Sequence, residues 1–373
     1  MTEFSRRVEQ VSISGIREVF EAAGEDAINL GLGQPDFPTP EHAREGAIEA
    51  IRAGKADEYT SNKGTESLRE AIAHRYAEDR GMEIDPNDTI ATAGGSEALH
   101  IAMEAHVDPG EEVIFPDPGF VAYEALTHIA GGEPTPVALR DDLTMDPESV
   151  EEAITDDTAA FVVNSPGNPT GAVQSPEDMR EFARIADEHD VLCISDEVYE
   201  HIVFDGEHRS PLEFAETDNV VVVSACSKTY SMTGWRLGWV TGSTRRIERM
   251  LRVHQYGQAC ATAAAQHAAE AALTGPQDPV DEMVAAFEER RDVLLDGLDD
   301  IGLDCPTPKG AFYAMPEVPE GFVDEVIDRG VVAVPGEAFG EHGKGYARIS
   351  YAVNVETLKE ALEIMDEAYD AVA

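Results

Sequence analysis

The sequence of 373 residues has little positive charge, and lysine is its scarcest charged residue. It holds 27 Lys+Arg, of which six are lysines, against 74 Asp+Glu, which gives a formal net charge of -47. Such a charge repels nucleic-acid phosphates and anionic lipids, so we expect neither a nucleic acid nor a membrane as a partner. Molar salt shortens the Debye length to about 3 Å and screens the repulsion within the chain. The composition therefore favours the cytoplasm of an extreme halophile over that of an ordinary mesophile.

Cysteine and long apolar runs are also scarce. The four cysteines have no C-x-x-C spacing, which argues against a zinc site or a redox pair, and we expect them to be reduced and mostly buried. No run of about eighteen apolar residues is present, and MTEFSRRVEQ lacks the apolar core of a signal peptide. We therefore expect no metal, no membrane span and a cytoplasmic location.

Between about residues 89 and 241, short β-branched runs alternate with amphipathic stretches. The alternation predicts strands at 89–92, 112–115, 159–163, 191–195, 220–224 and 237–241. Helices are expected between most of these strands, including 96–105 and 177–188, the second entered through Ser175-Pro176 as cap and first-turn proline. The predicted fold class is α/β, with a large domain whose central sheet is mostly parallel and covered by helices.

The pattern changes from Pro279 onward. There we expect a smaller α+β domain, with helices at 280–298 and 355–371 and short strands at 311–314 and 348–351. The resulting division is an N-terminal arm with part of the small domain at 1–40, a large domain at 41–275 and the small C-terminal domain at 276–373. The arm contains Gly31-Leu32-Gly33-Gln34-Pro35, which excludes regular structure there, and we expect it to cross the cleft to the small domain.

Ligands of such sheets bind beyond the carboxyl ends of the strands, where loops and helix N-termini meet. The segments at those ends are 93–96, 117–120, 164–171, 196–199 and 227–228. Gly94-Gly95-Ser96 can turn backbone N–H groups toward an anion, although such a turn is often only a turn. The sequence contains neither a G-x-G-x-x-G nor a P-loop pattern, so it does not indicate binding of a dinucleotide or a nucleoside triphosphate.

Lys228 is the one lysine in this set. It follows a run of valines, and burial together with the nearby Arg236 would lower its pKa, as an amine nucleophile requires. The alternative is a loop lysine that extends into solvent. Asp196 follows the apolar VLCIS, where a buried carboxylate needs a cationic or N–H partner, although Asp at such a junction is also a common helix N-cap. An Asp and a Lys together suit pyridoxal phosphate (PLP), which has an aldehyde and a protonatable ring nitrogen.

Four motifs, NSPGNPTG, DEVYEH, SKTYSMTGWRLG and ARISYA, resemble the class I/II PLP-dependent aminotransferases of fold type I. The resemblance is closest to the bacterial and archaeal aspartate aminotransferase branch. With GLGQPDFPTP, YTSNKGTESLREAIA and GAFYAMP it extends in order over nearly the whole chain. It implies ping-pong transamination of an L-amino acid, aspartate or a related one, with a 2-oxo acid such as 2-oxoglutarate.

The resemblance also implies roles for residues around the cofactor ring. Lys228 would form the internal aldimine and then act as general base, and Asp196 would pair with the pyridine nitrogen and keep it protonated. Tyr199 and Asn168 would donate to the phenolic oxygen. Phe120 would stack on the ring.

The implied phosphate site consists of backbone and side-chain donors, namely Gly95, Ser96 and Arg236. In a homodimer with shared active sites, Tyr59 would reach this phosphate from the second subunit. Ala225 departs from the hydroxyl residue that many relatives carry three positions before the lysine. Ser227 or a water molecule is therefore expected to supply that hydrogen bond.

For the substrate, the resemblance implies that Arg348 binds the α-carboxylate, with Gly33 and Asn168 beside it. Ile16, Phe312 and the loop 258–262 are candidates to line the side-chain pocket, and all are uncharged. Aspartate is the favoured donor, while alanine, aromatic and branched amino acids stay open.

Two other functions are alternatives. A PLP-dependent β-eliminating lyase or decarboxylase shares the lysine, the aspartate and the fold. A regulator that keeps an aminotransferase-like ligand domain would need a basic DNA-binding extension, and the charge of the chain argues against one.

We predict that dialysis into low-salt buffer unfolds the protein, because the carboxylates then repel one another without screening. Far-ultraviolet circular dichroism during stepwise removal of salt measures this. An unchanged spectrum and an unchanged melting temperature in dilute buffer would show that the charge is no halophilic adaptation.

Overall fold

The computed structural model describes residues 4–12 and 27–372. Its central feature is a seven-stranded sheet with the strand order β2-β8-β7-β6-β5-β3-β4. β8 is antiparallel to both of its neighbours, and the other pairs are parallel. The strands are β2 (Thr89–Thr92), β3 (Glu112–Asp117), β4 (Glu133–Ala138), β5 (Thr158–Asn164), β6 (Leu192–Asp196), β7 (Val220–Ala225) and β8 (Gly238–Gly242). The predicted mostly parallel α/β sheet is confirmed.

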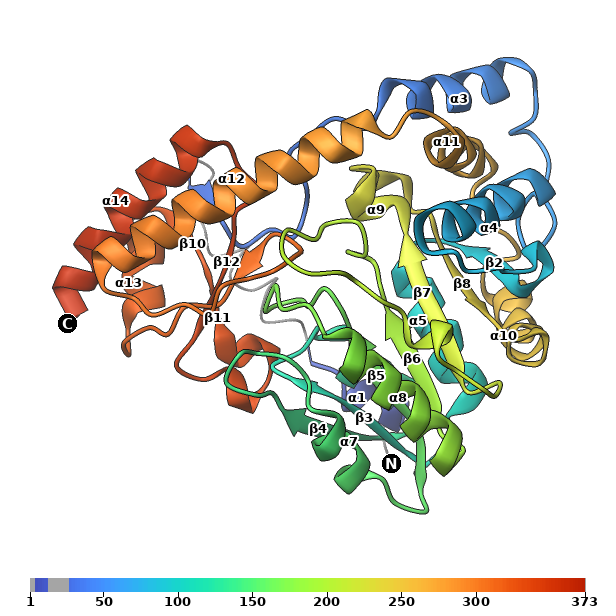
Figure 1. The fold of residues 1–373 in the computed structure, drawn as a ribbon, viewed down its shortest axis with the longest axis horizontal. Coiled ribbons are helices and arrows are strands. Elements are labelled where there is room, and N and C mark those ends of the chain that lie inside the picture. The colour runs from blue at the N-terminus through green and yellow to red at the C-terminus, as the bar shows by residue number, and fades with distance from the viewer. Residues whose placement is uncertain (1–3, 13–26, 373) are drawn as a thin grey trace.

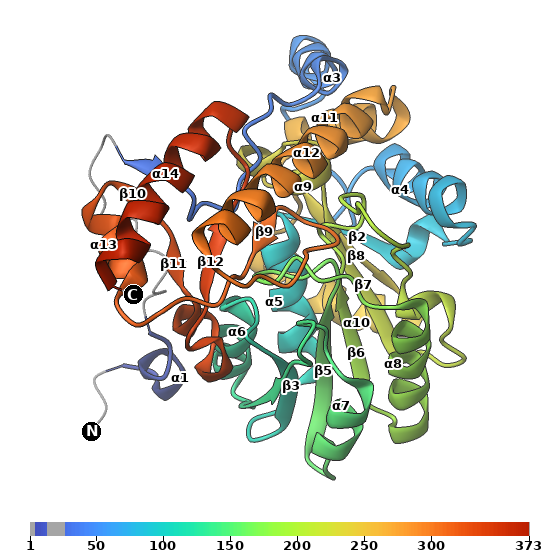
Figure 2. The ribbon, with the colours of Figure 1, turned by 60° about the vertical axis from the view of Figure 1, so that its left-hand side comes forward.

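Helices cover both faces of this sheet because its strands are apolar on both sides. In β7, Val221 and Val223 pack with α5, α6 and α10, whereas Val222 packs with α3, α4 and α11 on the opposite face. α7 and α8 cover that second face farther along the sheet. Figure 2 shows these layers edge-on. The helices are α3 (Glu41–Arg52), α4 (Glu66–Arg80), α5 (Gly95–His106), α6 (Ala122–Ala130), α7 (Pro147–Ala153), α8 (Pro176–His189), α9 (Cys226–Thr229), α10 (Thr244–Gly257) and α11 (Ala263–Thr274).

Local signals in the sequence explain where α8 begins and why β4 escaped prediction. The Ser175 side chain accepts a hydrogen bond from the Asp178 N–H, and Pro176 occupies the first turn, as predicted. β4 contains Pro134 and Pro136, which argue against a strand. It lies at the edge of the sheet and pairs only with β3, so proline is tolerated there.

A second unit follows α12 (Asp278–Ile301), which runs from the large sheet to the C-terminal helix (Figure 1). Its sheet has the order β11-β12-β9, formed by Val334–Pro335, Ala347–Ser350 and Tyr313–Ala314, and α13 (Phe322–Asp328) and α14 (Val355–Val372) complete it. β1 (Ile28–Asn29) pairs in parallel with β10 (Val331–Val332). The arm thus crosses to this unit, while the short helix α1 (Arg6–Glu9) contacts α6 of the large unit. We propose the domain boundaries given above for these units.

Two further expectations can be compared with the structure. No helix in the described part of the chain is long and apolar enough to cross a membrane. All four cysteines are free, as expected, but only Cys193 and Cys226 are buried. Cys260 and Cys305 are partly exposed, so the expectation of mostly buried cysteines was wrong for these two, which lie in loops.

The two units are joined at Asp117, the last residue of β3. Its carboxylate accepts hydrogen bonds from the backbone N–H groups of Glu341 and His342, both at 3.1 Å, and lies 3.0 Å from His342 Nδ1. The Gly119 N–H donates to the Phe339 carbonyl at 2.9 Å. Asp117 belonged to the strand-end segments that predict ligand binding, but here it ties the small unit to the large one.

We predict that Gly340→Ala weakens this junction. Gly340 has a φ of +138°, and an added Cβ would overlap the carboxylate oxygen of Asp117. Backbone strain of about 1–3 kcal/mol and lost hydrogen bonds of about 1 kcal/mol each should lower the free energy of unfolding by about 3 kcal/mol.

Gly345→Ala is the matched control, because Gly345 has a φ of +89° and nothing lies within 4 Å of the added Cβ. It should cost about 1 kcal/mol from the backbone alone. Urea unfolding in high salt measures both variants. Equal costs would show that Asp117 does not hold the junction.

Candidate functional site

A cavity of about 310 Å³ lies at the carboxyl ends of the large-sheet strands. The arm forms part of its wall through residues 31–34, and the small unit contributes Tyr313 and Arg348. Most of the predicted site residues line it, namely Gly33, Gly95, Ser96, Phe120, Asn168, Asp196, Tyr199, Ser227, Lys228, Arg236 and Arg348. Segments far apart in the sequence therefore converge on one space, as the strand-end argument predicts.

Lys228 points into this cavity from α9, the short helix after β7. Its Nζ donates a hydrogen bond to the Gly33 carbonyl at 2.6 Å. Burial, Arg348 and Arg236 together lower the pKa of this amine to about 8, against the opposing effect of Asp196. The lowering by burial and Arg236 matches the sequence argument, whereas the larger effect of Arg348 did not follow from it. About a tenth of the amine is thus neutral at pH 7, far more than for an ordinary lysine.

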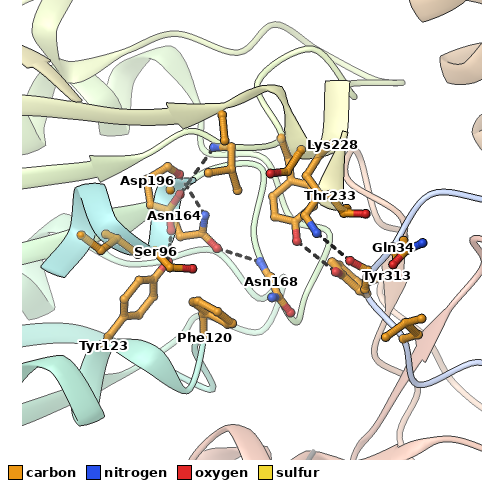
Figure 3. A pocket seen from close by; sticks show the side chains of 18 of the residues that line it. Gln34, Ser96, Phe120, Tyr123, Asn164, Asn168, Asp196, Lys228, Thr233 and Tyr313 are labelled. Atoms are coloured by element: carbon orange, nitrogen blue, oxygen red, sulfur yellow. Dashed lines mark hydrogen bonds between the residues drawn. The ribbon is translucent and has the colours of Figure 1, made fainter. Parts of the chain in front are cut away.

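Asp196 ends β6 and is 3% exposed. One carboxylate oxygen accepts a hydrogen bond from the Tyr123 hydroxyl at 2.8 Å, and the other accepts one from the Val198 N–H at 3.4 Å. Burial raises the pKa of the carboxyl to about 6 in spite of these bonds. Figure 3 shows Tyr123 reaching Asp196 from below. A carboxylate held by two neutral donors in so dry a place is suited to a cationic ligand group.

Tyr199 and Asn168 stand between the carboxylate and the small unit. The Tyr199 hydroxyl lies 2.9 Å from the Tyr313 hydroxyl, and burial raises the pKa of both phenols, which keeps them protonated. The Asn168 N–H donates to the Asn164 side-chain oxygen at 2.8 Å, and Asn164 in turn donates to the Asp196 carbonyl at 2.9 Å. Asn168 is therefore anchored to the end of β6 (Figure 3).

The start of α5 forms a cradle for an anion. Gly94 has a φ of +82°, and a Cβ there would lie 2.6 Å from an Arg236 side-chain nitrogen, so only glycine permits this approach. The N-terminal N–H groups of α5 and the Arg236 guanidinium thus lie together, which suits a phosphate. Ser224 is not available, because its hydroxyl donates to Glu200 at 2.5 Å. Ser227 lines the cavity beside Ala225, and its hydrogen bond to a phosphate stays a prediction.

Arg348 faces the cavity from β12 and is 2% exposed. It donates to the Asn168 side-chain oxygen at 3.0 Å and to the Gly31 carbonyl. Its Cζ atom lies 4.7 Å from the ring centroid of Tyr313 and 4.6 Å from that of Phe339. Burial lowers the pKa of this guanidinium. Its Nε is buried and has no hydrogen-bond partner among the residues that the structure describes. A planar carboxylate would satisfy it.

Three predicted positions are not in the cavity. Phe312 is fully buried and packs on Phe287 and Tyr199 in the small-unit core, so its expected place in the substrate pocket was wrong. Its neighbour Tyr313 lines the cavity instead. Tyr59 is 89% exposed and lies outside the cavity, as does the loop 258–262. Ile16 lies outside the described residues.

Sequence analysis missed Tyr123 and Tyr313. Tyr123 lies three residues after Phe120, close to one helical turn, and a buried Asp196 needs a donor, so this spacing was an available signal. Tyr313 begins β9, and Phe312 lies in the turn just before it, with the two ring centroids 4.8 Å apart. Since no strand alternation separates these two neighbours, which of them lines the cavity depends on the packing of the small unit.

Known proteins match this chain over nearly its whole length. The family described as aminotransferase class I and II matches residues 25–365. A probable aspartate aminotransferase of Methanocaldococcus jannaschii is 41% identical over 377 aligned residues, covering 98% of this chain and 100% of that protein.

Two solved structures have closely similar folds. The aspartate aminotransferase from Thermus thermophilus with maleate is 36% identical, with a TM-score of 0.94 and coverage of 99% of this chain and 100% of the other. An alanine aminotransferase from Pyrococcus furiosus is 33% identical, with the same TM-score and the same coverage.

We predict that the Lys228 amine of the cofactor-free protein is half-protonated near pH 8 and not near pH 10.5, as an ordinary lysine would be. Acetylation by acetic anhydride, followed by mass spectrometry of the Lys228 peptide across a pH series, measures this. The rate should rise with pH and level off above about 8, because only the neutral amine reacts.

Arg348→Gln should raise this midpoint by removing a positive charge, and Asp196→Asn should lower it by removing a negative one. Arg184→Gln, on the outer face of α8, is the control and should leave it unchanged. A midpoint near that of an exposed lysine would show that the site does not tune this amine.

Proposed function

This chain belongs to the aminotransferase class I and II family and is an aminotransferase, and from that premise we propose that it binds PLP at the cavity and uses Lys228 as its catalytic amine. The observation that supports this most directly is the pairing of a Lys228 amine whose pKa is lowered to about 8 with a buried Asp196 carboxylate in one cavity. The lyase and decarboxylase alternative finds no counterpart in the comparisons.

The donors around the cavity fit PLP group by group. The cradle of Gly94, Gly95 and Arg236 would hold the phosphate, and Asp196 would face the ring nitrogen. Phe120 lines the cavity next to Tyr123, with ring centroids 5.7 Å apart, and would cover one face of the ring. When bound, PLP supplies an aldehyde for the amine and an electron-withdrawing ring for the substrate Cα–H bond.

The residues of the chain then manage protons and orientation. Asp196 holds a proton on the facing ring nitrogen, and its bonds from Tyr123 and Val198 fix its direction. Tyr199 and Asn168 present hydrogen-bond donors toward the ring oxygen. Lys228 Nζ, with a lowered pKa, would accept the proton that leaves the substrate Cα and would later give that proton up again, as a general base and then a general acid.

Arg348 would bind the α-carboxylate of the amino acid. Its fixed position between two aromatic rings and its unsatisfied Nε suit a bidentate carboxylate. We propose aspartate as the favoured donor and 2-oxoglutarate as acceptor, supported by the relatives named for aspartate. The neighbour named for alanine keeps a smaller donor open, because few contacts separate such substrates.

We also propose a homodimer with shared sites in a salt-rich cytoplasm. Large apolar or aromatic side chains are exposed near the expected interface, namely Ile48, Ile51, Tyr59 and Tyr256. Ile48 and Ile51 lie on α3, and Tyr59 follows that helix. A second copy would cover them and bring its own Tyr59 to the phosphate cradle.

A titration with PLP and an amino-acid panel in high salt tests the function. The protein should gain visible absorption with PLP, and borohydride should trap PLP on Lys228. Aspartate or another single donor should then bleach the absorption, and a 2-oxo acid should restore it. Release of ammonia and pyruvate without a new amino acid would instead identify a lyase.

Lys228→Ala should lower turnover by at least about a thousandfold, since it removes both the nucleophile and the base. Lys309→Ala, which removes an exposed lysine, is the control and should keep full activity. Full turnover by Lys228→Ala would refute the mechanism.

A further inference from the structure

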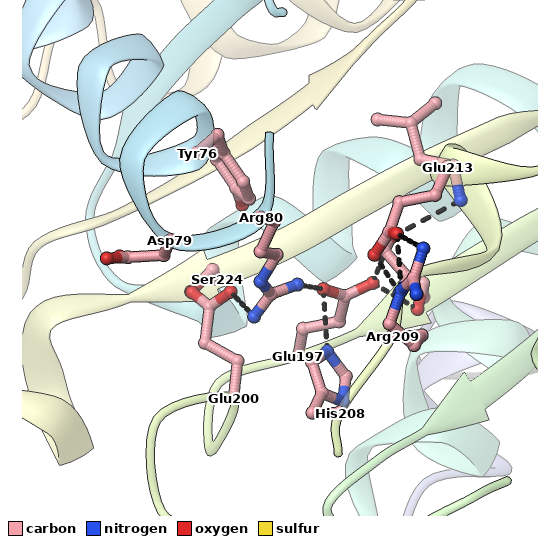
Figure 4. Close-up of polar contacts among 12 residues, drawn as sticks. Tyr76, Asp79, Arg80, Glu197, Glu200, His208, Arg209, Glu213 and Ser224 are labelled. Atoms are coloured by element: carbon pink, nitrogen blue, oxygen red, sulfur yellow. Dashed lines mark hydrogen bonds and ion pairs between the residues drawn. The ribbon is translucent and has the colours of Figure 1, made fainter. Parts of the chain in front are cut away.

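A buried cluster of charged side chains lies behind the cavity and contributes nothing to its wall. Arg80, at the end of α4, donates to a Glu197 carboxylate oxygen at 2.8 Å and to a Glu200 carboxylate oxygen. The Arg80, Glu197 and Glu200 side chains are 8%, 0% and 4% exposed. Figure 4 shows the Arg80 guanidinium between the two carboxylates. None of the three lines the cavity.

Each carboxylate of the cluster has further partners. Glu197 accepts hydrogen bonds from the Ser195 and Ser210 hydroxyls at 2.7 and 2.6 Å and lies 3.1 Å from His208 Nε2. Glu200 accepts one from Ser224 at 2.5 Å. Both carboxylates thus have more than one partner, as buried charges need in order to be stable.

The charges in this cluster argue against a metal ion. Ligand atoms of Glu197, Glu200 and His208 lie within 4.8 Å of one another, a spacing that a cation could use. Arg80 already supplies the positive charge between the two carboxylates. Burial alone would raise the pKa of Glu197, but His208 and Arg80 hold it below its usual range, and the two glutamates in turn raise the pKa of Arg80.

The cluster alternates in sequence with the proposed catalytic side chains. In the segment Asp196–Glu200, Asp196 and Tyr199 face the cavity, whereas Glu197 and Glu200 face Arg80. The Glu200 N–H donates to the Glu197 carbonyl at 2.9 Å, which closes the turn. Anything that holds Glu197 and Glu200 therefore fixes the direction of Asp196 and Tyr199.

We propose that Arg80 is a positioning residue for the aminotransferase site: by binding both Glu197 and Glu200 it holds the turn that presents Asp196 and Tyr199 to the cofactor. The inference rests on the proposed function. It assigns a role in the site to α4, a helix that has no residue in the cavity wall.

The test compares Arg80→Met and Arg80→Lys with the unchanged protein. The N–H groups of Glu200 and Ile202 donate to the carbonyls of Glu197 and Tyr199 within the turn. In the cofactor-free protein, these two amides should exchange with deuterium about tenfold faster in Arg80→Met, because the turn opens more readily. With PLP added, the dissociation constant should rise and the induced circular dichroism of the bound chromophore should weaken. The kcat should fall about tenfold to a hundredfold while KM changes less.

Arg80→Lys keeps the charge but cannot reach both carboxylates with a planar fork, so it should lie between the unchanged protein and Arg80→Met. If Arg80→Met does not fold, the same measurements on Arg80→Lys test the proposal. Arg75→Met is the matched control on the same helix, since Arg75 pairs with Asp79 beside it, and it should leave every measurement unchanged.

Ile72→Ala separates positioning from stability, because Ile72 is fully buried on α4. It should lower the melting temperature without altering the chromophore signal or kcat. The proposal is wrong if both Arg80 variants match Arg75→Met, or if Ile72→Ala reproduces the Arg80→Met pattern at equal stability. If the unchanged protein binds no PLP, the proposed function fails, and unaltered exchange of the turn amides would separately refute the anchoring by Arg80.

Discussion

The site depends on an acid and an amine that are buried at the ends of two neighbouring parallel strands. β6 and β7 pair so that Asp196 lies opposite Val223, and Lys228 follows three residues after β7 ends. Burial favours the uncharged form of each group: it raises the pKa of Asp196 to about 6 and lowers that of Lys228 to about 8. A ligand that brings both a cationic ring and a carbonyl carbon satisfies the pair, which is why PLP chemistry suits this place.

The large unit does not complete the site by itself. The Gly33 carbonyl, which accepts from Lys228, comes from the arm, and Arg348 comes from the small unit. Phe339 packs on Arg348, and its carbonyl accepts from Gly119, next to Asp117 at the junction. We propose that binding of a substrate carboxylate at Arg348 and placement of the cofactor ring near Phe120 are linked through the same contact between the units.

Charge is distributed in two different ways in this protein. Most of its 74 acidic residues give the chain its large net charge, and salt would screen their mutual repulsion. Glu197 and Glu200 are different, because they are buried and each is bound to Arg80. Salt screens these buried ion pairs little, so the salt concentration should affect the Arg80 cluster much less than it affects the surface charges.

Much of the fold was predictable from local patterns. The valine run of β7, buried on both faces, and the Ser175-Pro176 start of α8 are signals that a short window contains. Predicting β4 required knowing that it is an edge strand that pairs only with β3, where Pro134 and Pro136 are tolerated. Placing Phe312 failed because it lies in a turn just before β9, where no local pattern decides which of two adjacent aromatic residues lines the cavity.

The sequence by itself determined the α/β class, the edge of the sheet where a ligand is expected, and the lysine and aspartate at that edge, because short segments contain the strand and helix patterns and the residue types. Only the tertiary structure decided that Tyr123 holds Asp196, that Arg348 lowers the pKa of Lys228 and that Arg80 lies behind the turn. These contacts join residues 73 to 120 positions apart, and they arise from the packing of helices and units that no local pattern encodes.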